Sequence, residues 1–156
     1  MTIHDQTPQD NPHEPPEDFA GMFIDYCTPQ EIGVLGEWIA MRWLIACGYL
    51  VEAAHSFDLT AGSPDTKQVH KIEVKTARMS ADGTYQFVLF KLGHTDHQRA
   101  DYIVLLCLTP DGEVVPFVIP ASATALMTKI TIPTDPRTYR GQWQLYRQQT
   151  GMLVLK

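Results

Sequence analysis

The stretch Lys71-Ile72-Glu73-Val74-Lys75-Thr76 decides the fold, because its charged and apolar residues alternate as they do in a β-strand. Side chains two positions apart on a strand point to the same face of the sheet, so Glu73 and Lys75 should lie next to each other. Val74 should point to the opposite face, into a core. The stretch therefore predicts a strand that presents an acid and a lysine together.

A second acid stands upstream of this strand. Asp58 lies in residues 54–60, a second stretch with extended character, and the polar, turn-rich residues 61–68 separate the two stretches. If the stretches pair as a hairpin, Asp58 and Glu73 can share a hard divalent cation, with Lys75 beside it. Such a group is suited to the hydrolysis of phosphodiesters. The same residues also admit a plainer interpretation, an ion-pair cluster on a sheet edge, which would contribute little to stability.

A helix should precede both stretches. Thr28-Pro29-Gln30-Glu31 has the pattern of a capping box, with Thr at the N-cap, Pro at the first helical position and Glu returning to the cap amide. Apolar residues then recur at helical spacing until Gly48, a typical C-terminal stop. Glu37 lies next to the apolar stripe, and small neighbours leave room for its carboxylate to reach the sheet edge. In the alternative interpretation, Glu37 is only a boundary residue of the helix.

Periodicity and turn residues predict the remaining elements. Residues 100–108 are nearly all apolar, which is typical of a central strand buried on both faces. Pro116 should place the following strand, residues 113–119, at an edge of the sheet, because proline cannot donate a backbone hydrogen bond. We also expect strands at residues 49–54, 69–76, 84–90 and 130–132, a short helix or turn at 95–99, a short helix from Pro120, and a helix over 139–149.

The order of these features is similar to that of a known superfamily. A helix with Glu37, a strand with Asp58 and a strand with Glu73 and Lys75 resemble the PD-(D/E)XK nucleases, which have the restriction-endonuclease-like fold and include Holliday-junction resolvases and some homing endonucleases. The resemblance covers roughly residues 29–108. It departs from the motif at Phe57, where the family often has Pro. It implies an α/β fold with an αβββαβ core, a mixed central sheet flanked by helices, and here an extra C-terminal strand and helix.

The resemblance also implies an activity, that of a Mg²⁺-dependent endodeoxyribonuclease hydrolysing DNA phosphodiester bonds. Asp58 and Glu73 would hold Mg²⁺, which Mn²⁺ could replace, and the carbonyl of Val74 would complete the ligands. Lys75 would orient or activate the attacking water and stabilise charge on the phosphoryl group, and Glu37 would support the site. Contacts to DNA would come from polar residues that bracket the site, namely Lys67, Lys71, Arg78, Gln86, Lys91 and Arg99.

Other functions remain open at this point. The chain could be a non-catalytic nucleic-acid-binding or interaction module that keeps the fold, or the nuclease subunit of a larger complex, because a fold does not settle a function. No recognition helix or zinc finger is visible in the sequence. Specificity would therefore come from loops, from DNA shape, or from a homodimer or a protein partner.

Length and charge bound the organisation of the chain. At 156 residues it should form one domain. The first twenty residues hold five acids and no Lys or Arg, so we expect residues 1–20 to be a disordered, acidic, Pro-rich tail and residues 21–156 to be a single domain. Without that tail, 13 acids face 12 bases, and the body is close to neutral. Three scattered cysteines favour reduced thiols in a cytoplasmic protein, and no apolar run approaches the ~20 residues of a membrane helix.

Overall fold

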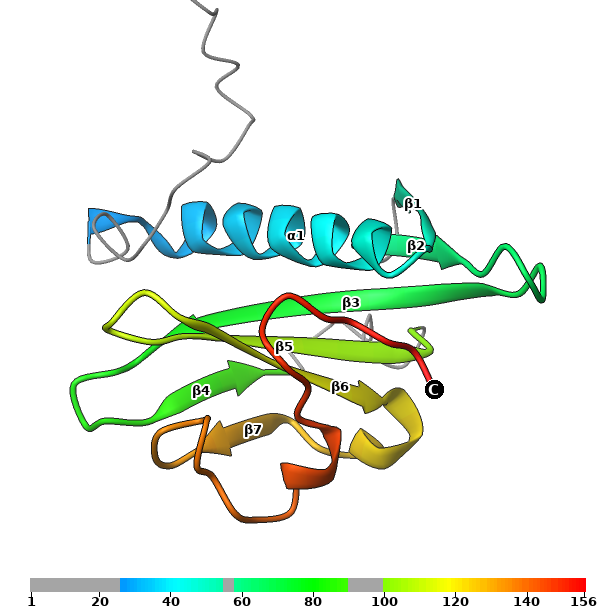
Figure 1. The fold of residues 1–156 in the computed structure, drawn as a ribbon. Helices are drawn as coiled ribbons and strands as arrows, with labels where there is room; N and C mark the ends of the chain where they lie inside the picture. The colour runs from blue at the N-terminus through cyan, green and yellow to red at the C-terminus, as the bar shows by residue number, and fades with distance from the viewer. Residues whose placement is uncertain (1–25, 55–57, 90–99) are drawn as a thin grey trace, which may run out of the picture.

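One helix and two sheets form the fold in the computed structural model, which describes residues 26–54, 58–89 and 100–156. Helix α1 (Pro29–Ala46) lies along one face of a five-stranded sheet, and a two-stranded sheet lies on the other side (Figure 1). The large sheet contains, in spatial order, β1 (Leu50–Ala53), β2 (Leu59–Gly62), β3 (Val69–Arg78), β5 (Tyr102–Leu108) and β6 (Val114–Pro120). The mixed α/β class predicted from the sequence is confirmed.

The smaller elements complete the chain. The two-stranded sheet pairs β4 (Tyr85–Val88) with β7 (Lys129–Ile132) in antiparallel register. Two single-turn 3₁₀ helices follow β6 and β7, namely η2 (Ala121–Thr124) and η3 (Gln144–Tyr146). Within the described ranges no helix is long and apolar enough to cross a membrane.

Helix α1 begins and ends where its sequence predicts. The Thr28 hydroxyl accepts a hydrogen bond from the Glu31 amide, and the Glu31 carboxylate accepts one from the Thr28 amide, so the capping box is complete. Gly48 follows the helix with a φ of +94°, a conformation that glycine adopts without a steric penalty. Both ends of α1 are thus fixed by local chemistry.

The large sheet is mixed because one of its four pairings is parallel. Strand β3 is parallel to β5, with Val74 opposite Val104, whereas β1–β2, β2–β3 and β5–β6 are antiparallel. Parallel neighbours need a long crossover, and here the crossover includes β4. Strand β5 is buried on both faces and β6 lies at the edge, as predicted. Pro116 is on β6, and its carbonyl accepts a hydrogen bond from the Gln148 amide.

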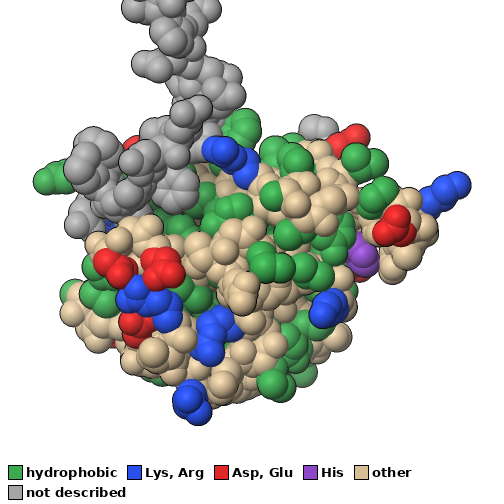
Figure 2. All heavy atoms as spheres, in the orientation of Figure 1, with side chains coloured by type: hydrophobic (Ala, Val, Ile, Leu, Met, Phe, Trp, Pro, Cys, Tyr) green, Lys and Arg blue, Asp and Glu red, His purple; other side chains and the backbone are tan. Residues whose placement is uncertain are grey.

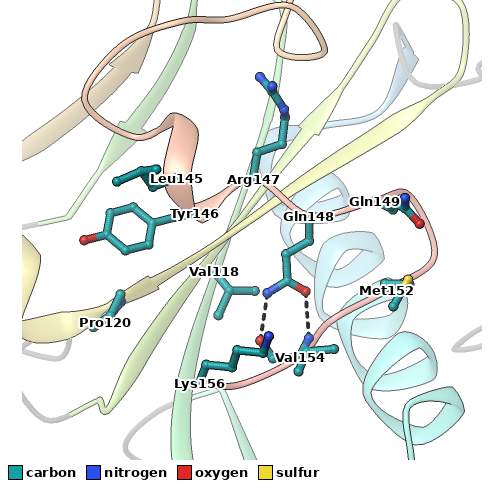
Figure 3. A pocket seen from close by; sticks show the side chains of 10 residues that line it. All are labelled: Val118, Pro120, Leu145, Tyr146, Arg147, Gln148, Gln149, Met152, Val154 and Lys156. Carbon is teal, nitrogen blue, oxygen red and sulfur yellow. Dashed lines mark hydrogen bonds between the residues drawn. The ribbon is translucent and has the colours of Figure 1, made fainter.

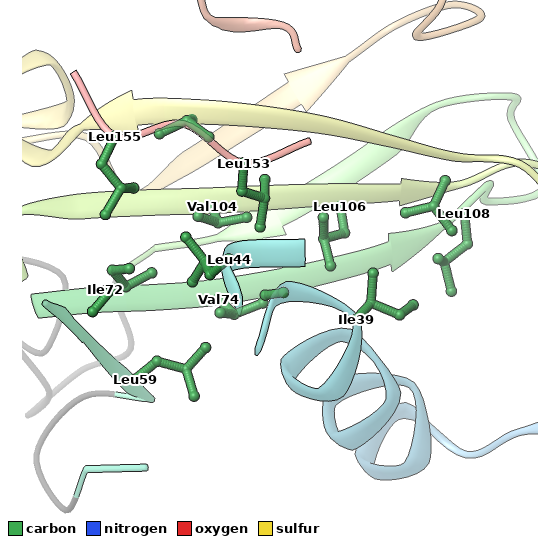
Figure 4. Packing of buried hydrophobic residues seen from close by; sticks show 14 of the residues in the cluster. Ile39, Leu44, Leu59, Ile72, Val74, Val104, Leu106, Leu108, Leu153 and Leu155 are labelled. Carbon is green, nitrogen blue, oxygen red and sulfur yellow. The ribbon is translucent and has the colours of Figure 1, made fainter. Parts of the chain in front are cut away.

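Each face of the large sheet has its own hydrophobic core. On one face Ile72 and Val74 of β3 pack with Ile39 and Leu44 of α1 (Figure 4). On the other face Ala77, two positions further along from Lys75, packs in a cluster that includes side chains of β4 and β7. Alternation along β3 therefore places Val74 toward α1, and Glu73 and Lys75 toward the opposite face.

One expectation about a strand needs correction. Asp58 was expected inside a strand over residues 54–60, but β2 begins at Leu59 and extends to Gly62, so Asp58 precedes it. The strand expected over residues 84–90 is present as β4, which pairs with β7 in a sheet of its own. The limits of a strand and its pairing partner depend on distant parts of the chain and not on local alternation. The predicted turn or helix at 95–99 lies outside the described residues, so α1 is the one α-helix of the described ranges.

The predicted C-terminal helix over residues 139–149 is wrong, since this segment contains only η3. The ring of Tyr139 folds over Gly141, where a Cβ atom would lie 2.6 Å from Cζ of that ring. Further along, Arg147 bridges to Phe117, and the Gln148 amide donates to β6. The segment is extended there because the edge of β6 supplies backbone partners that a continuous helix would forgo.

Candidate functional site

The candidate site lies where the edge of β3 loses its strand partner. Strand β2 pairs with β3 only from Val69 to Ile72, whereas β5 continues beside β3 as far as Arg78. Beyond Ile72, no strand of the described ranges covers the edge of β3 that faces β2. The backbone of residues 73–76 therefore has no strand partner on this side, and groups from α1 and from the start of β2 can approach it.

Asp58 is held at this open edge. Leu59 stands opposite Ile72, so the register brings the preceding residue next to Glu73. The Val74 amide donates a hydrogen bond of 2.7 Å to Oδ2 of Asp58. In an antiparallel ladder the N–H and C=O groups of one residue point to the same neighbour, so the Val74 carbonyl also points toward this edge. The structure thus brings Asp58, Glu73 and the backbone of Val74 together.

Glu73 combines deep burial with an incomplete set of hydrogen bonds. The residue is 4% exposed, and its Oε1 lies 2.8 Å from Nζ of Lys75. Its Oε2 is buried and has no hydrogen-bond partner among the described residues. A buried charged oxygen without a donor is costly, because it has lost its water and gained nothing in return. The second oxygen of Glu73 is therefore available to a ligand that would complete its interactions.

Glu37 approaches the same edge from α1. It is half-buried, and burial, followed by the negative charge of Asp58, raises the pKa of its carboxyl above the usual value. The two carboxylates are thus close enough for their charges to interact. The cluster wraps around the edge of β3, with Glu37 on the side of α1, Glu73 and Lys75 on the opposite face, and Asp58 between them.

These residues fit a small hard cation. Mg²⁺ commonly binds through one or two carboxylates and other oxygen atoms, and the unpartnered Oε2 of Glu73 is such an oxygen. Asp58 and the Val74 carbonyl supply the other candidate oxygens. Over the described ranges, no group of three or more His, Cys, Asp or Glu side chains gathers in a way that could hold a metal. Two carboxylates and one backbone carbonyl form an all-oxygen set, which suits magnesium better than a metal that requires four protein side chains.

The residues expected to contact DNA are spread around the site. Lys67 and Lys71 are exposed on the β2–β3 hairpin, and the Lys71 amide is held by Oδ2 of Asp101. Arg78 is half-buried, and its guanidinium donates to the carbonyl of Cys27, which ties β3 to the start of α1. Gln86 is exposed on β4 and donates to the hydroxyl of Thr84. The other two, Lys91 and Arg99, lie outside the described residues.

Two residues next to the site were not among the predicted site residues, although Gly36 was one of the small neighbours expected to leave room for Glu37. Thr76 follows Lys75 on β3, and its buried Oγ1 has no hydrogen-bond partner in the part of the chain that the structure describes. Gly36, which precedes Glu37, packs directly against Thr76. One signal was present in the sequence: alternation from Ile72 and Val74 places a polar Thr76 on the apolar face of β3.

A second cluster of charges lies at the other end of the sheet, near the turn from β5 to β6. Figure 2 shows acidic and basic side chains crowded on one side of the visible face, where this turn lies. Arg137 contacts the carboxylates of Asp111, Glu113 and Asp135 at 2.7, 2.6 and 2.9 Å. Hydrogen bonds from Thr109 and then Arg137 lower the pKa of Asp111. All three carboxylates of this cluster are partnered and exposed.

A groove of about 560 Å³ lies beside the outer edge of β6 (Figure 3). The side-chain amide of Gln148 forms two 2.7 Å hydrogen bonds with the backbone of Val154, which holds the C-terminal segment along one wall. Its charged lining side chains are those of Arg147 and Lys156, and no Asp or Glu is among its described lining residues. None of the predicted site residues that the structure describes lines this groove, so the candidate chemistry lies at β3.

The chain is similar in structure to a known endonuclease. The bacterial homing endonuclease I-Ssp6803I aligns with a TM-score of 0.60 over 78% of this chain and 89% of its own. The fold resembles that of a homing endonuclease. The two sequences are 17% identical over the alignment, so the likeness shows the fold alone. No protein-family model matches the sequence, and no curated protein sequence matches it.

Proposed function

We propose that this protein is a metal-dependent DNA endonuclease of the PD-(D/E)XK type, with its site at the open edge of β3. The observation that carries the proposal is the buried Glu73 carboxylate, which has one oxygen on Lys75 and the other without a partner in the described residues. Natural proteins rarely keep such a group in a core unless it has a function. The nuclease fold of the similar structure supports the same conclusion.

Each residue of the cluster has a distinct role in this proposal. Asp58, Glu73 and the Val74 carbonyl would hold Mg²⁺ or Mn²⁺. The ion would supply Lewis-acid stabilisation of negative charge on the phosphate oxygens. The Lys75 ammonium, which Glu73 holds at 2.8 Å, would orient the attacking water and stabilise the charge that develops on the phosphoryl group. Glu37 would support the site from α1.

DNA is the proposed substrate because the site suits a phosphodiester and basic residues flank it. Lys67 and Lys71 project from the β2–β3 hairpin and would contact phosphates without reading sequence. The body of the chain is nearly neutral, so binding without metal should be modest and should weaken steeply as salt rises.

Cleavage assays on four substrates test the proposal directly. Supercoiled plasmid, linear duplex, single strand and four-way junction would be incubated with Mg²⁺, with Mn²⁺ and with chelator. At least one substrate should be cut with either metal and none with chelator. Glu73→Gln should be inactive, whereas Lys129→Ala on β7, far from the cluster, should cut as the wild type does. A pure, folded protein that binds DNA and cuts none of the four would favour a non-catalytic module.

A further inference from the structure

Helix α1 packs tightly against the sheet at Gly36. A Cβ atom built on this glycine would lie 2.7 Å from Cβ of Thr76, and closer still to the Thr76 hydroxyl oxygen. Real Cβ atoms do not come so close to another side chain, so only glycine fits here while Thr76 keeps its position. The space next to α1 is filled by the threonine of β3.

Gly33, one turn earlier on the same helix, shows that this requirement is local. Apart from its two chain neighbours and the backbone of its own helix, a Cβ atom at Gly33 would have no described atom within 4 Å. Both glycines lie in the same regular helix, so the backbone conformation demands neither. Gly36 differs because it is buried against β3.

The position of Thr76 is set by packing. Its Oγ1 is buried without a hydrogen-bond partner among the described residues, so no hydrogen bond seen there fixes its rotamer. The side chain is a wedge between β3 and α1. It stands directly after Lys75, and the glycine that it touches stands directly before Glu37.

We propose that Gly36 and Thr76 are positioning residues, whose contact sets the distance between α1 and β3 and so brings Glu37 to the carboxylate of Asp58. The inference rests on the proposed nuclease function and deepens it. A methyl group at position 36 would push α1 outward or rotate Thr76. Either change displaces Glu37, and displacements of about 1 Å near a reacting centre can reduce rates about a hundredfold.

A matched pair of glycine substitutions tests the proposal. Gly36→Ala and Gly33→Ala add the same methyl group to the same helix, and both should retain the far-ultraviolet circular dichroism of the wild type. Single-turnover cleavage at saturating Mg²⁺ should fall about 10- to 100-fold in Gly36→Ala, with little change in DNA affinity. Gly33→Ala should cleave as the wild type does. Equal cleavage by both variants would overturn the inference.

A double-substitution cycle separates positioning from a general loss of stability. If Gly36→Ala acts through Glu37, then adding Glu37→Gln should cost much less in the Gly36→Ala background than in the wild type. Fully additive losses would contradict the proposal. The double variant Gly36→Ala, Thr76→Gly adds a methyl group on the helix and removes the side chain that it would meet. It should therefore regain much of the lost cleavage rate. No recovery in a folded double variant would also reject it.

Thr76→Val keeps the branched shape and removes the hydroxyl, so it decides the matter even if Gly36→Ala does not fold. It should cleave at a rate far closer to wild type than to Glu37→Gln. A loss as large as that of Glu37→Gln would mean that the hydroxyl itself acts, and would overturn the packing role. A wild-type protein that cleaves nothing rejects the proposed function, whereas a cleaving wild type with an unaffected Gly36→Ala rejects only this inference.

Discussion

The molecule carries two clusters that each combine three carboxylates with one basic residue, and the two differ in almost every physical respect. At the turn from β5 to β6, Arg137 contacts all three carboxylates of its cluster within 3 Å, and the group is exposed. At the edge of β3, Glu73 pairs with Lys75 while Asp58 and Glu37 approach from the start of β2 and from α1, and one oxygen of the buried Glu73 has no partner in the described residues.

The difference follows from the shape of the cation and from burial. A guanidinium presents five donors in a planar fork and can serve several carboxylates, whereas an ammonium is a compact point charge. The pKa values follow this pattern. Hydrogen bonds lower the pKa values of Asp111 and Asp135, whereas burial and then the charge of Asp58 raise the pKa of Glu37. One cluster is complete as it stands. In the other, one oxygen of the buried Glu73 has no donor among the described residues, and such an oxygen can serve a bound cation.

Removing any central member of the β3 cluster should have the largest effect. Asp58→Ala, Glu73→Ala and Lys75→Ala should each reduce single-turnover cleavage at least about a thousandfold, because the three groups act as a unit. Circular dichroism should show that the fold is retained. Arg137→Ala is the control from the other cluster and should cleave at the wild-type rate. A Lys75→Ala variant that cleaves normally would remove the lysine from the mechanism.

Replacing Glu73 with an apolar residue of similar length should change stability and cleavage in opposite directions. Glu73→Met removes a buried oxygen without a partner, so the metal-free protein should gain about 1–3 kcal/mol in its free energy of unfolding. For a chain of this size, each kcal/mol corresponds to about 2–4 °C in Tm. Cleavage should be lost in the same variant. A lower Tm in chelator would show that Glu73 stabilises the fold by itself.

Glu37→Gln should reduce cleavage by an intermediate amount and should make the metal-free protein more stable at neutral pH. Loss of the charge should reduce cleavage about 10- to 100-fold, as changes around a metal site do. The native state of the wild type binds this proton more tightly than the unfolded state does. Stability therefore falls as pH rises from the usual value of 4.5 through the raised pKa.

The glutamine cannot titrate, so Glu37→Gln should be more stable than the wild type at neutral pH without metal. The two proteins should converge below the usual pKa. Thermal melts in chelator across this pH range would show the crossover, and parallel curves would contradict it.

Arg137→Ala should have the smallest effect of the series on stability at neutral pH. Its ion pairs are exposed, and such pairs are screened by water and salt. Because the pKa values of Asp111 and Asp135 are lowered, their contribution is present at neutral pH and is lost as the pH falls from 3.8 through the lowered values. Melts at low and high salt should barely separate the variant from the wild type. A large fall in Tm would show that the two clusters are less different than their exposure suggests.

Local patterns in the sequence determined much of the fold. The capping box and Gly48 set the ends of α1, the apolar run set β5, and Pro116 placed β6 at an edge. Alternation on β3 predicted that Glu73 and Lys75 would be neighbours, and they form an ion pair. These features could be predicted because each depends on residues a few positions apart.

Tertiary structure alone decided the rest, because it depends on contacts between distant parts of the chain. Local alternation does not say that β4 pairs with β7, that the C-terminal segment extends along β6, or that Asp58 meets the Val74 amide ahead of β2. The sequence contains both Gly36 and Thr76, forty positions apart, but only the packing of α1 on β3 makes the glycine necessary. Burial likewise exists only in the folded chain. It removes water from Oε2 of Glu73 and leaves this oxygen without a hydrogen-bond partner among the described residues.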